Sequence, residues 1–378
     1  MAKKILIVDD SALMRRVSCD IIAEDERFEV ADMAKNGLEA LDLLKANRYD
    51  AVILDVNMPR MNGLELLREL QKLNISARVL MFSTQTGEGC RETIEALELG
   101  AIDFIQKPES FINTGDSKFK KRFIELLSEV AKANSYIAPV RKTASLSETR
   151  KQIGESAANT ERILKNLGEK RVSGNVYSRK PIERITGEKV VAIASSTGGP
   201  RALQGVIPKL PANLNAPVVL VQHMPAGFTK SLAERLDQLS DIRVKEAEEG
   251  DKLEKGWVYI APGGKHMKIG RSGREYRIYF SAEPPREGVR PCANYMYETL
   301  SDSDFSQICC CVLTGMGADG TEGIKNLSKI KKVHVIAQDE ETCAVYGMPK
   351  AIAATGLVNE ILPLEEVAAA ITKVVGTK

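Results

Sequence analysis

The chain has 378 residues, of which 43% are hydrophobic and 28% charged, and its formal net charge is +2 at pH 7. This length is sufficient for two or three domains. The near-neutral balance argues against a nucleic-acid partner, which usually meets a concentrated basic face.

The cysteine pattern and the hydropathy indicate in which cellular compartment the protein is found. None of the seven cysteines forms a Cys-x-x-Cys pair, and three are consecutive in an apolar run at 309–311, as is typical of buried, reduced thiols. No stretch of about 18 apolar residues and no signal-peptide core occurs. We therefore expect a cytoplasmic protein without membrane insertion.

Residues 1–133 alternate short apolar runs with segments whose apolar residues recur at three- and four-residue spacing. Parallel strands buried on both faces read as continuous Val/Ile/Leu runs, so this pattern predicts a five-stranded parallel sheet covered by helices on both faces. Phe119–Val130 is the last predicted helix. The apolar runs lie near 5–8, 28–33, 51–54, 79–82 and 102–105.

Polar side chains follow several of these runs. Asp9 and Asp10 close the first run, and Asp55 ends the third. Since parallel strands end at one edge of a sheet, the three carboxylates form an oxygen-rich pocket suited to Mg²⁺. Ser83 and Lys107 follow the fourth and fifth runs and supply the hydroxyl and ammonium that a phosphoryl group on Asp55 would contact. This pattern predicts a phosphorylation switch.

The composition changes at 134–187, which is rich in Ser, Thr, Asn, Lys and Arg and has few apolar residues. The segment Ser147–Leu167 can form a marginal helix. We expect 134–187 to be a linker between a domain at 1–133 and a second domain at 188–378.

The α/β pattern resumes at Lys189 and predicts a doubly wound α/β domain whose sheet is mainly parallel. The segment 270–280 alternates instead like an exposed hairpin. The apolar runs are 190–194, 217–221, 308–313 and 333–337.

Three of these runs end in residues suited to nucleophilic chemistry. One ends in Ser195-Ser-Thr-Gly-Gly-Pro200, the next precedes His223, and another ends in a Gly-rich turn that carries Asp319. A hydroxyl on a tight strand-to-helix turn lies near backbone N–H donors, and a Ser/His/Asp triad is defined by geometry, not chain order. Each feature alone is more often structural, so hydrolysis and a structural reading stay open here. The turn lacks a GxGxxG pattern, which disfavours a dinucleotide site.

Taken together, these motifs resemble the chemotaxis receptor methylesterases of the CheB family over nearly the whole chain outside the linker. The resemblance implies a flavodoxin-like receiver followed by a methylesterase domain. The receiver motifs are Asp9, Asp10, Asp55, Met58-Pro59, Ser83, Phe104 and Lys107-Pro108. The methylesterase motifs are Ser196-Thr-Gly-Gly199, Gln222-His-Met-Pro225, Ala261-Pro-Gly-Gly-Lys-His266, Leu313–Gly320 and Val345-Tyr-Gly-Met-Pro349.

The resemblance implies roles for the second domain. Ser196 would be the nucleophile, His223 the general base and Asp319 the orienting acid, with the backbone N–H of Met316 as oxyanion donor. Ser195 is the alternative nucleophile, but the register of the Thr-Gly-Gly motif favours Ser196. The implied substrate is a γ-glutamyl methyl ester on the cytoplasmic bundle of a chemoreceptor, with methanol as product and receptor-glutamine deamidation as a second activity. Ester hydrolysis of this kind needs no metal.

For the receiver, the resemblance implies that a chemotaxis histidine kinase phosphorylates Asp55. Lys107 would pair with the phosphate, and Ser83 and Phe104 would be the switch residues. In the family, the unphosphorylated receiver covers the esterase cleft. The implied Mg²⁺ ligands are Asp9, Asp10, Asp55 and the backbone of Asn57.

Two other functions compete with this interpretation. A phosphorylation-controlled binding module without catalysis is disfavoured because Ser196, His223 and Asp319 are all present. A transcription factor is disfavoured because the second domain is too long, too rich in strands and too neutral. His266 and His334 are expected to be structural.

Overall fold

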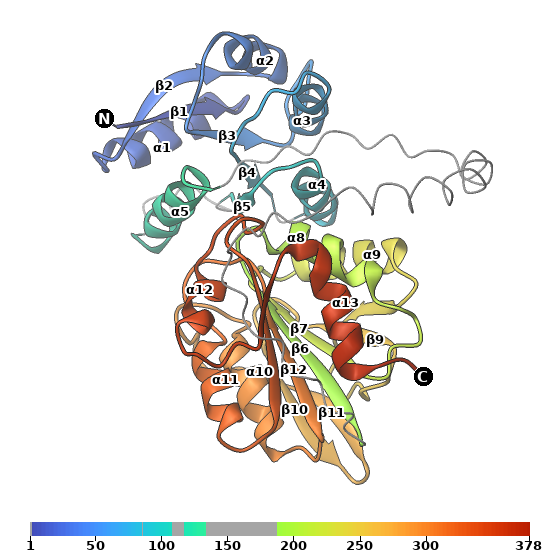
Figure 1. The fold of residues 1–378 in the computed structure, drawn as a ribbon. Helices are drawn as coiled ribbons and strands as arrows, with labels where there is room; N and C mark the ends of the chain where they lie inside the picture. Colours follow the sequence, from blue (N-terminus) through green and yellow to red (C-terminus); the bar gives the residue numbers. More distant parts are fainter. Residues whose placement is uncertain (1, 85, 108–116, 134–186) are drawn as a thin grey trace, which may run out of the picture.

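The computed structural model describes residues 2–84, 86–107, 117–133 and 187–378, which form two α/β domains in contact (Figure 1). Nearly all of the predicted linker at 134–187, including the marginal helix at 147–167, lies outside the described residues. The domain boundaries therefore stay a prediction.

The N-terminal domain is a parallel sheet with strand order β2-β1-β3-β4-β5, which confirms the predicted fold. Its strands are Lys3–Val8 (β1), Phe28–Ala34 (β2), Ala51–Asp55 (β3), Val79–Ser83 (β4) and Asp103–Gln106 (β5). Its helices are Ala12–Ala23 (α1), Gly37–Ala46 (α2), Gly63–Lys72 (α3), Gly87–Glu98 (α4) and Ser117–Val130 (α5).

Local sequence sets where helix α3 begins. The Asn62 side chain accepts from the Glu65 N–H while the Glu65 carboxylate accepts from the Asn62 N–H, which is a capping box. A Cβ at Gly63 would lie 2.3 Å from the Asp55 carbonyl oxygen. Only glycine therefore lets α3 start directly beside the end of β3.

The C-terminal domain contains a seven-stranded sheet of order β14-β13-β12-β6-β7-β9-β8, in which every adjacent pair is parallel. This confirms the predicted fold and adds three short strands, β8, β9 and β14, to the four predicted. The strands are Lys189–Ser195 (β6), Val218–Gln222 (β7), Arg243–Glu246 (β8), Trp257–Ile260 (β9), Gln307–Val312 (β12), Val333–Gln338 (β13) and Glu360–Leu362 (β14).

Helices cover both faces of this sheet, as its two apolar clusters show. One face packs α8, α9 and α13, and the other packs α10, α11 and α12. The helices are Gly199–Val206 (α8), Phe228–Leu239 (α9), Ala293–Thr299 (α10), Thr321–Ser328 (α11), Met348–Ala353 (α12) and Leu364–Val375 (α13), with single 3₁₀ turns at Ile207–Lys209 (η2) and Leu300–Asp302 (η3).

An antiparallel hairpin, His266–Ser272 (β10) with Glu275–Ser281 (β11), forms where alternation predicted it. It is less exposed than expected. Tyr276 and Ile278 are buried because they join the apolar cluster that contains Met296 and Tyr297 of α10.

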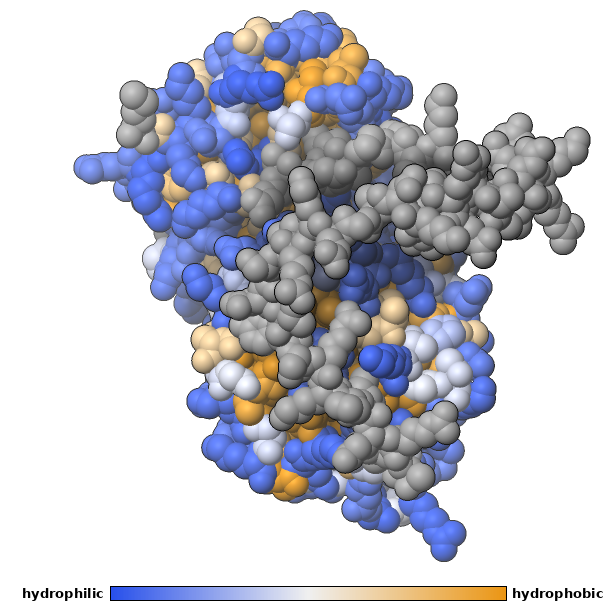
Figure 2. All heavy atoms as spheres, in the orientation of Figure 1, coloured by the Kyte–Doolittle hydropathy of each residue, from blue (hydrophilic) through white to orange (hydrophobic). Residues whose placement is uncertain are grey.

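The two domains share an apolar cluster, in which α4 packs against α8 and α9. The face drawn in Figure 2 is largely hydrophilic, with small separate apolar areas. Among the residues that the structure describes, no helix has both the length and the apolar character needed to cross a bilayer.

Candidate active site and phosphorylation site

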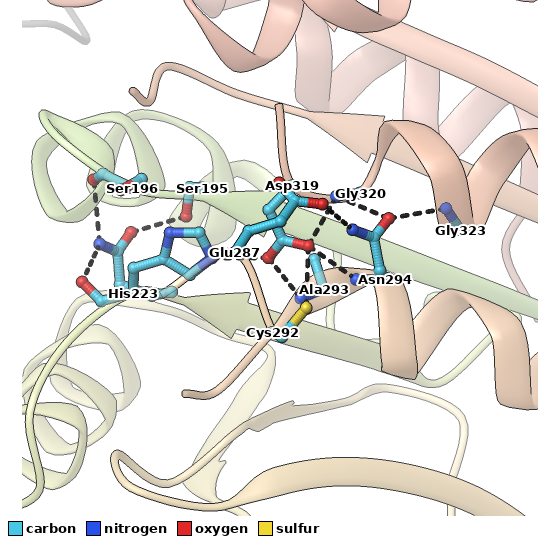
Figure 3. A network of polar contacts seen from close by, with 11 residues as sticks. Ser195, Ser196, His223, Glu287, Cys292, Ala293, Asn294, Asp319, Gly320 and Gly323 are labelled. Atoms are coloured by element: carbon cyan, nitrogen blue, oxygen red, sulfur yellow. Dashed lines mark hydrogen bonds and ion pairs between the residues drawn. The ribbon is translucent and has the colours of Figure 1, made fainter. Parts of the chain in front are cut away.

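The strand order places three predicted residues at one sheet edge. Strands β12, β6 and β7 are consecutive in the sheet, and their carboxyl ends lead into Asp319, Ser196 and His223 respectively. Figure 3 shows the three side chains at these strand ends. Ser196 is 5% exposed and Asp319 3%. Residues 123 positions apart in the sequence therefore form one buried polar group.

His223 and Asp319 are in direct contact, with 2.7 Å between Nε2 and Oδ2. In the part of the chain that the structure describes, no hydrogen bond occupies the other ring nitrogen, Nδ1, so this atom is open to a nucleophile. Among the described residues, the Ser196 hydroxyl makes no hydrogen bond to His223. Catalytic hydrogen bonds are often loose without substrate, so this geometry is compatible with a resting triad.

The two adjacent serines have different environments. The fully buried Ser195 hydroxyl donates to Gln222 Oε1 at 2.7 Å, and Gln222 Nε2 donates to the carbonyl of Ser196 at 2.9 Å. A Cβ at Gly199 would lie 2.0 Å from Gln222 Oε1, so glycine is required for this approach. Ser195 is thus engaged in holding the turn, which favours Ser196 as the reactive hydroxyl.

The Asp319 carboxylate is surrounded by donors. Burial alone would raise its pKa, but hydrogen bonds from His223 and from its other donors outweigh burial and hold the pKa below its usual value. The donors therefore favour the ionised form of Asp319 beside His223. The other donors are the N–H groups of Ala293 (2.6 Å to Oδ2), Asn294 (2.9 Å to Oδ1) and Gly320 (2.8 Å to Oδ1) and the Cys292 thiol (3.1 Å to Oδ1).

Met316 lies on the turn that packs beside Ser196. The Ser196 N–H donates to the Thr314 carbonyl at 3.0 Å, and the Gly315 N–H donates to the Val345 carbonyl at 3.0 Å. None of the described residues accepts a hydrogen bond from the Met316 N–H. This free donor next to Ser196 is what an oxyanion site requires.

The predicted acidic pocket is present in the N-terminal domain. Asp9, Asp10 and Asp55 each place a carboxylate oxygen within 4.8 Å of the others. Lys107 Nζ lies 2.9 Å from Asp9 Oδ2 and 2.8 Å from Asp55 Oδ1. Burial raises the pKa of Asp55 to about 6, with the Lys107 ammonium acting against it and Asp9 reinforcing it.

These residues fit a divalent cation. Three carboxylates lie together here, and the single ammonium of Lys107 pairs with two of them, Asp9 and Asp55, so the group keeps an excess of negative charge. A hard cation with oxygen ligands would supply the missing charge. Asn57 follows two residues after Asp55, and its exposed side chain donates to Glu92 at 3.2 Å.

The two predicted switch residues face away from this pocket. The buried Ser83 hydroxyl contacts the Thr93 hydroxyl and donates to the Gly89 carbonyl at 3.3 Å, both in α4. The Phe104 ring is 7% exposed, and its centroid lies 4.4 Å from that of Phe228 in α9.

Comparisons with known proteins agree with this arrangement. Residues 191–371 match the CheB methylesterase family, and residues 5–113 match the response regulator receiver domain. The chain is 41% identical to the protein-glutamate methylesterase/protein-glutamine glutaminase of Bacillus subtilis, over 98% of both chains. The chain belongs to the CheB methylesterase family.

Two further matches are a curated relative and a solved structure. A protein of the same name from Pyrococcus abyssi is 41% identical over 98% of this chain and 93% of its own. The crystal structure of the Thermotoga maritima CheB methylesterase catalytic domain is 41% identical, covers 50% of this chain and all of its own, and has a TM-score of 0.49. The prediction of a methylesterase family member with a receiver domain is confirmed.

The receiver domain meets the methylesterase domain near Thr197 and His223. Burial raises the pKa of Asp103 on β5, and the Thr197 hydroxyl, Arg122 and His223 act in the opposite direction. Asp103 is therefore close to the turn that carries Ser196 and Thr197. Glu98 at the end of α4 pairs with the guanidinium of Arg235, at 2.6 Å to Nε and 2.9 Å to Nη2, and accepts from Gln204 at 3.0 Å.

The other two histidines lie outside this group. His334 on β13 pairs with Glu360 on β14 at 2.9 Å. His266 is buried, and its Nε2 donates to the Pro284 carbonyl at 3.2 Å. Neither contacts Ser196 or Asp319, which is compatible with the predicted structural roles.

Proposed function

We propose that this chain is a phosphorylation-activated protein-glutamate methylesterase. It hydrolyses γ-glutamyl methyl esters on the cytoplasmic helical bundles of chemoreceptors, releases methanol and serves adaptation in chemotaxis. The observation that carries the proposal is the His223–Asp319 contact of 2.7 Å at the strand end next to that of Ser196. The names of the relatives also favour deamidation of receptor glutamines by the same acyl chemistry.

In the proposed reaction, His223 takes the Ser196 proton on the ring nitrogen that Asp319 leaves open, and the hydroxyl attacks the ester carbonyl. The Met316 N–H donates to the developing oxyanion. His223 then returns the proton to the departing methanol. Water, activated by His223, hydrolyses the acyl-enzyme and leaves a glutamate. No metal takes part in this sequence.

The receiver would be phosphorylated on Asp55 by a chemotaxis histidine kinase. Mg²⁺, when bound, would neutralise charge on the transferring phosphoryl group. Lys107, already 2.8 Å from Asp55, would pair with a phosphoryl oxygen. Ser83 and Phe104 would then leave their contacts with α4 and α9. The cation would be held by Asp9, Asp10, Asp55 and the backbone carbonyl of Asn57.

Regulation would follow from the domain contact. With Asp103 beside the catalytic turn and Phe104 against Phe228, the resting receiver would exclude a receptor helix from Ser196. A linker at 134–187 would keep a receiver of 1–133 tethered to a catalytic domain of 188–378 when the contact opens. A shift of about 1.4 kcal/mol between closed and open states gives tenfold activation.

The test is methanol release from methylated receptor membranes, with and without a small phosphodonor and Mg²⁺. We expect release that rises with the phosphodonor, a loss of roughly 10⁴–10⁶-fold for Ser196→Ala, and much smaller losses for the matched Ser195→Ala variant. Full activity of Ser196→Ala would refute the nucleophile assignment. No release by the wild type under either condition would favour a binding module instead.

A further inference from the structure

The catalytic acid sits in a set of contacts that the proposed mechanism does not use. We call the segment Cys292-Ala293-Asn294 the acid cradle, because all three of its residues donate to Asp319 (Figure 3). The segment lies where the chain enters α10, outside the sheet edge that carries the triad. Building on the proposed function, we infer that the side chains of Cys292 and Asn294 are positioning residues for the catalytic acid.

Cys292 acts on the carboxylate directly. Its sulfur lies 3.1 Å from Asp319 Oδ1, and the residue is fully buried. Burial and the neighbouring Asp319 charge raise the pKa of the thiol well above its usual value, so it remains a protonated donor.

The donors divide between the two carboxylate oxygens. Oδ2 accepts from His223 and the Ala293 N–H, whereas Oδ1 accepts from the Cys292 thiol and the N–H groups of Asn294 and Gly320. Rotation of the carboxylate about its Cβ–Cγ bond would break contacts on both oxygens. The cradle thus fixes the plane in which Asp319 meets the imidazole.

Asn294 acts on the turn that carries the acid. Its side-chain oxygen accepts from the N–H groups of Gly320 at 3.1 Å and Gly323 at 2.6 Å. Its amide donates to Glu287 at 2.8 Å. Because Asn294 is fully buried, its side chain holds the turn after Asp319 against the start of α10.

The thiol also influences the general base. Each donor draws negative charge away from the oxygen that faces His223. Without the Cys292 donor, Asp319 keeps more negative charge and stabilises the imidazolium form of His223 more strongly. His223 must be neutral to accept the Ser196 proton, so the acidic limb of kcat/KM moves to higher pH. The other charged groups near this pair are Asp103 from β5 and Glu287 behind Asn294, and both are unchanged in Cys292 variants.

The experiment is the pH profile of kcat/KM for methanol release by the full chain. For Cys292→Ala we expect the acidic limb of the kcat/KM profile to move to higher pH by about half a pH unit. For Cys292→Ser, which keeps a donor, we expect the limb at the same pH as in the wild type. The matched control is Cys310→Ala, which removes a fully buried thiol of β12 that does not contact Asp319. Its limb stays at the wild-type pH. If the alanine variant does not fold, Cys292→Val fills the site without a donor and carries the same expectation.

Asn294 is tested by a second pair of variants. Asn294→Ala should lower kcat roughly ten- to a hundredfold with little change in KM, because the acid is misplaced while the substrate surface is kept. Asn294→Ser keeps a neutral side-chain oxygen that can accept from Gly320 or Gly323 without placing a second carboxylate beside Asp319, so part of the activity should return.

An unmoved limb in Cys292→Ala and Cys292→Val, or an equal shift in Cys310→Ala, would overturn the role of the thiol. Equal losses in both Asn294 variants would overturn the role of the amide oxygen. Failure of the proposed function itself looks different. In that case the wild type releases no methanol, or Ser196→Ala remains active.

Discussion

Asp55 and Asp319 are the same residue type, each placed by the carboxyl edge of a parallel sheet and each almost fully buried, at 5% and 3% exposure. Their proton affinities nevertheless move in opposite directions. Burial raises the pKa of Asp55 to about 6, whereas the pKa of Asp319 lies below its usual value.

The difference lies in the hydrogen-bond donors, not in burial. In the described part of the chain, Asp55 accepts from the Val56 N–H at 2.8 Å, shares Lys107 with Asp9, and faces other carboxylates. Asp319 accepts from three N–H groups, a thiol and His223. A carboxylate with few donors keeps lone pairs for a cation and a phosphoryl group. A carboxylate whose lone pairs are filled serves only to orient its neighbour.

The largest effect is expected at Asp319, whose carboxylate lone pairs are all occupied by hydrogen-bond donors. Asp319→Asn should lower methanol release by roughly 10³–10⁴-fold, because an amide cannot stabilise the imidazolium and its NH₂ would face the donors of the acid cradle. The exposed Asp302→Asn variant is the control and should match the wild type. Activity within tenfold of the wild type in Asp319→Asn would show that the acid does not orient His223.

At Asp55, removing the negative charge of the carboxylate should stabilise the folded N-terminal domain. An Asp pKa of about 6 in the folded state exceeds the unfolded value of about 3.9, so stability is lost as pH rises from about 4 to about 6. Above pH 7 the ionised Asp55 costs roughly 2–3 kcal/mol, which Asp55→Asn removes.

This gain in the free energy of unfolding should raise the urea concentration at which half of the N-terminal domain is unfolded. The unfolding of this domain can be monitored by amide hydrogen exchange of its peptides. We expect Asp55→Asn to be more stable than the wild type at pH 8 and equal to it near pH 4. Asp42→Asn, at an exposed position of α2, should show no such pH dependence. A constant difference between pH 4 and pH 8 would contradict the raised pKa of Asp55.

Asp55→Asn should also abolish the response to a phosphodonor and leave basal methanol release intact, since Asp55 lies outside the proposed triad of Ser196, His223 and Asp319. For a tenfold activation this is a loss of about 1.4 kcal/mol of coupling. The measurement is the ratio of rates with and without phosphodonor at fixed Mg²⁺. An unchanged ratio would place the phosphoryl acceptor elsewhere.

The smallest predicted effect concerns the domain contact. Glu98→Arg or Arg235→Glu should raise basal methanol release about two- to fivefold. Each change removes a bidentate ion pair between the domains and places two like charges opposite each other. The double variant restores the pair in reverse and should return toward the wild-type rate. Glu322→Arg, on the exposed face of α11, is the charge control. Additive effects in the double variant would mean that the pair does not hold the closed state.

Both sites were visible in the sequence for one physical reason. A buried parallel strand reads as an apolar run, and the polar residue that follows it lies at the sheet edge. Asp9, Asp55 and His223 were found in this way, and the structure places them in two groups. The short strands β8, β9 and β14, of three or four residues, were missed because so few residues carry no detectable period.

The supporting residues could not be predicted in the same way. Cys292 caps helix α10 and Asn294 lies in its first turn, and they reach Asp319 across 25 to 27 residues without any repeated spacing. The sequence placed Gln222 only as a polar residue at the end of a strand and did not predict its hydrogen bonds to Ser195 and Ser196. Glu98 and Arg235 looked like ordinary charges on helix surfaces, and only the packing of α4 on α9 pairs them. Such contacts depend on how distant segments pack, within the C-terminal domain for Cys292, Asn294 and Gln222 and between the domains for Glu98 and Arg235, and local patterns do not encode this packing.

The contact between Phe104 and Phe228 has a consequence for the kinase side of the reaction. Free-energy linkage is reciprocal, so if phosphorylation of Asp55 weakens docking of the catalytic domain by some factor, docking opposes phosphorylation by the same factor. The catalytic domain is in this sense a ligand of the receiver's resting state. If the proposed switch holds, the phosphorylated form should be more favoured at equilibrium in a receiver released from Phe228 than in a docked one.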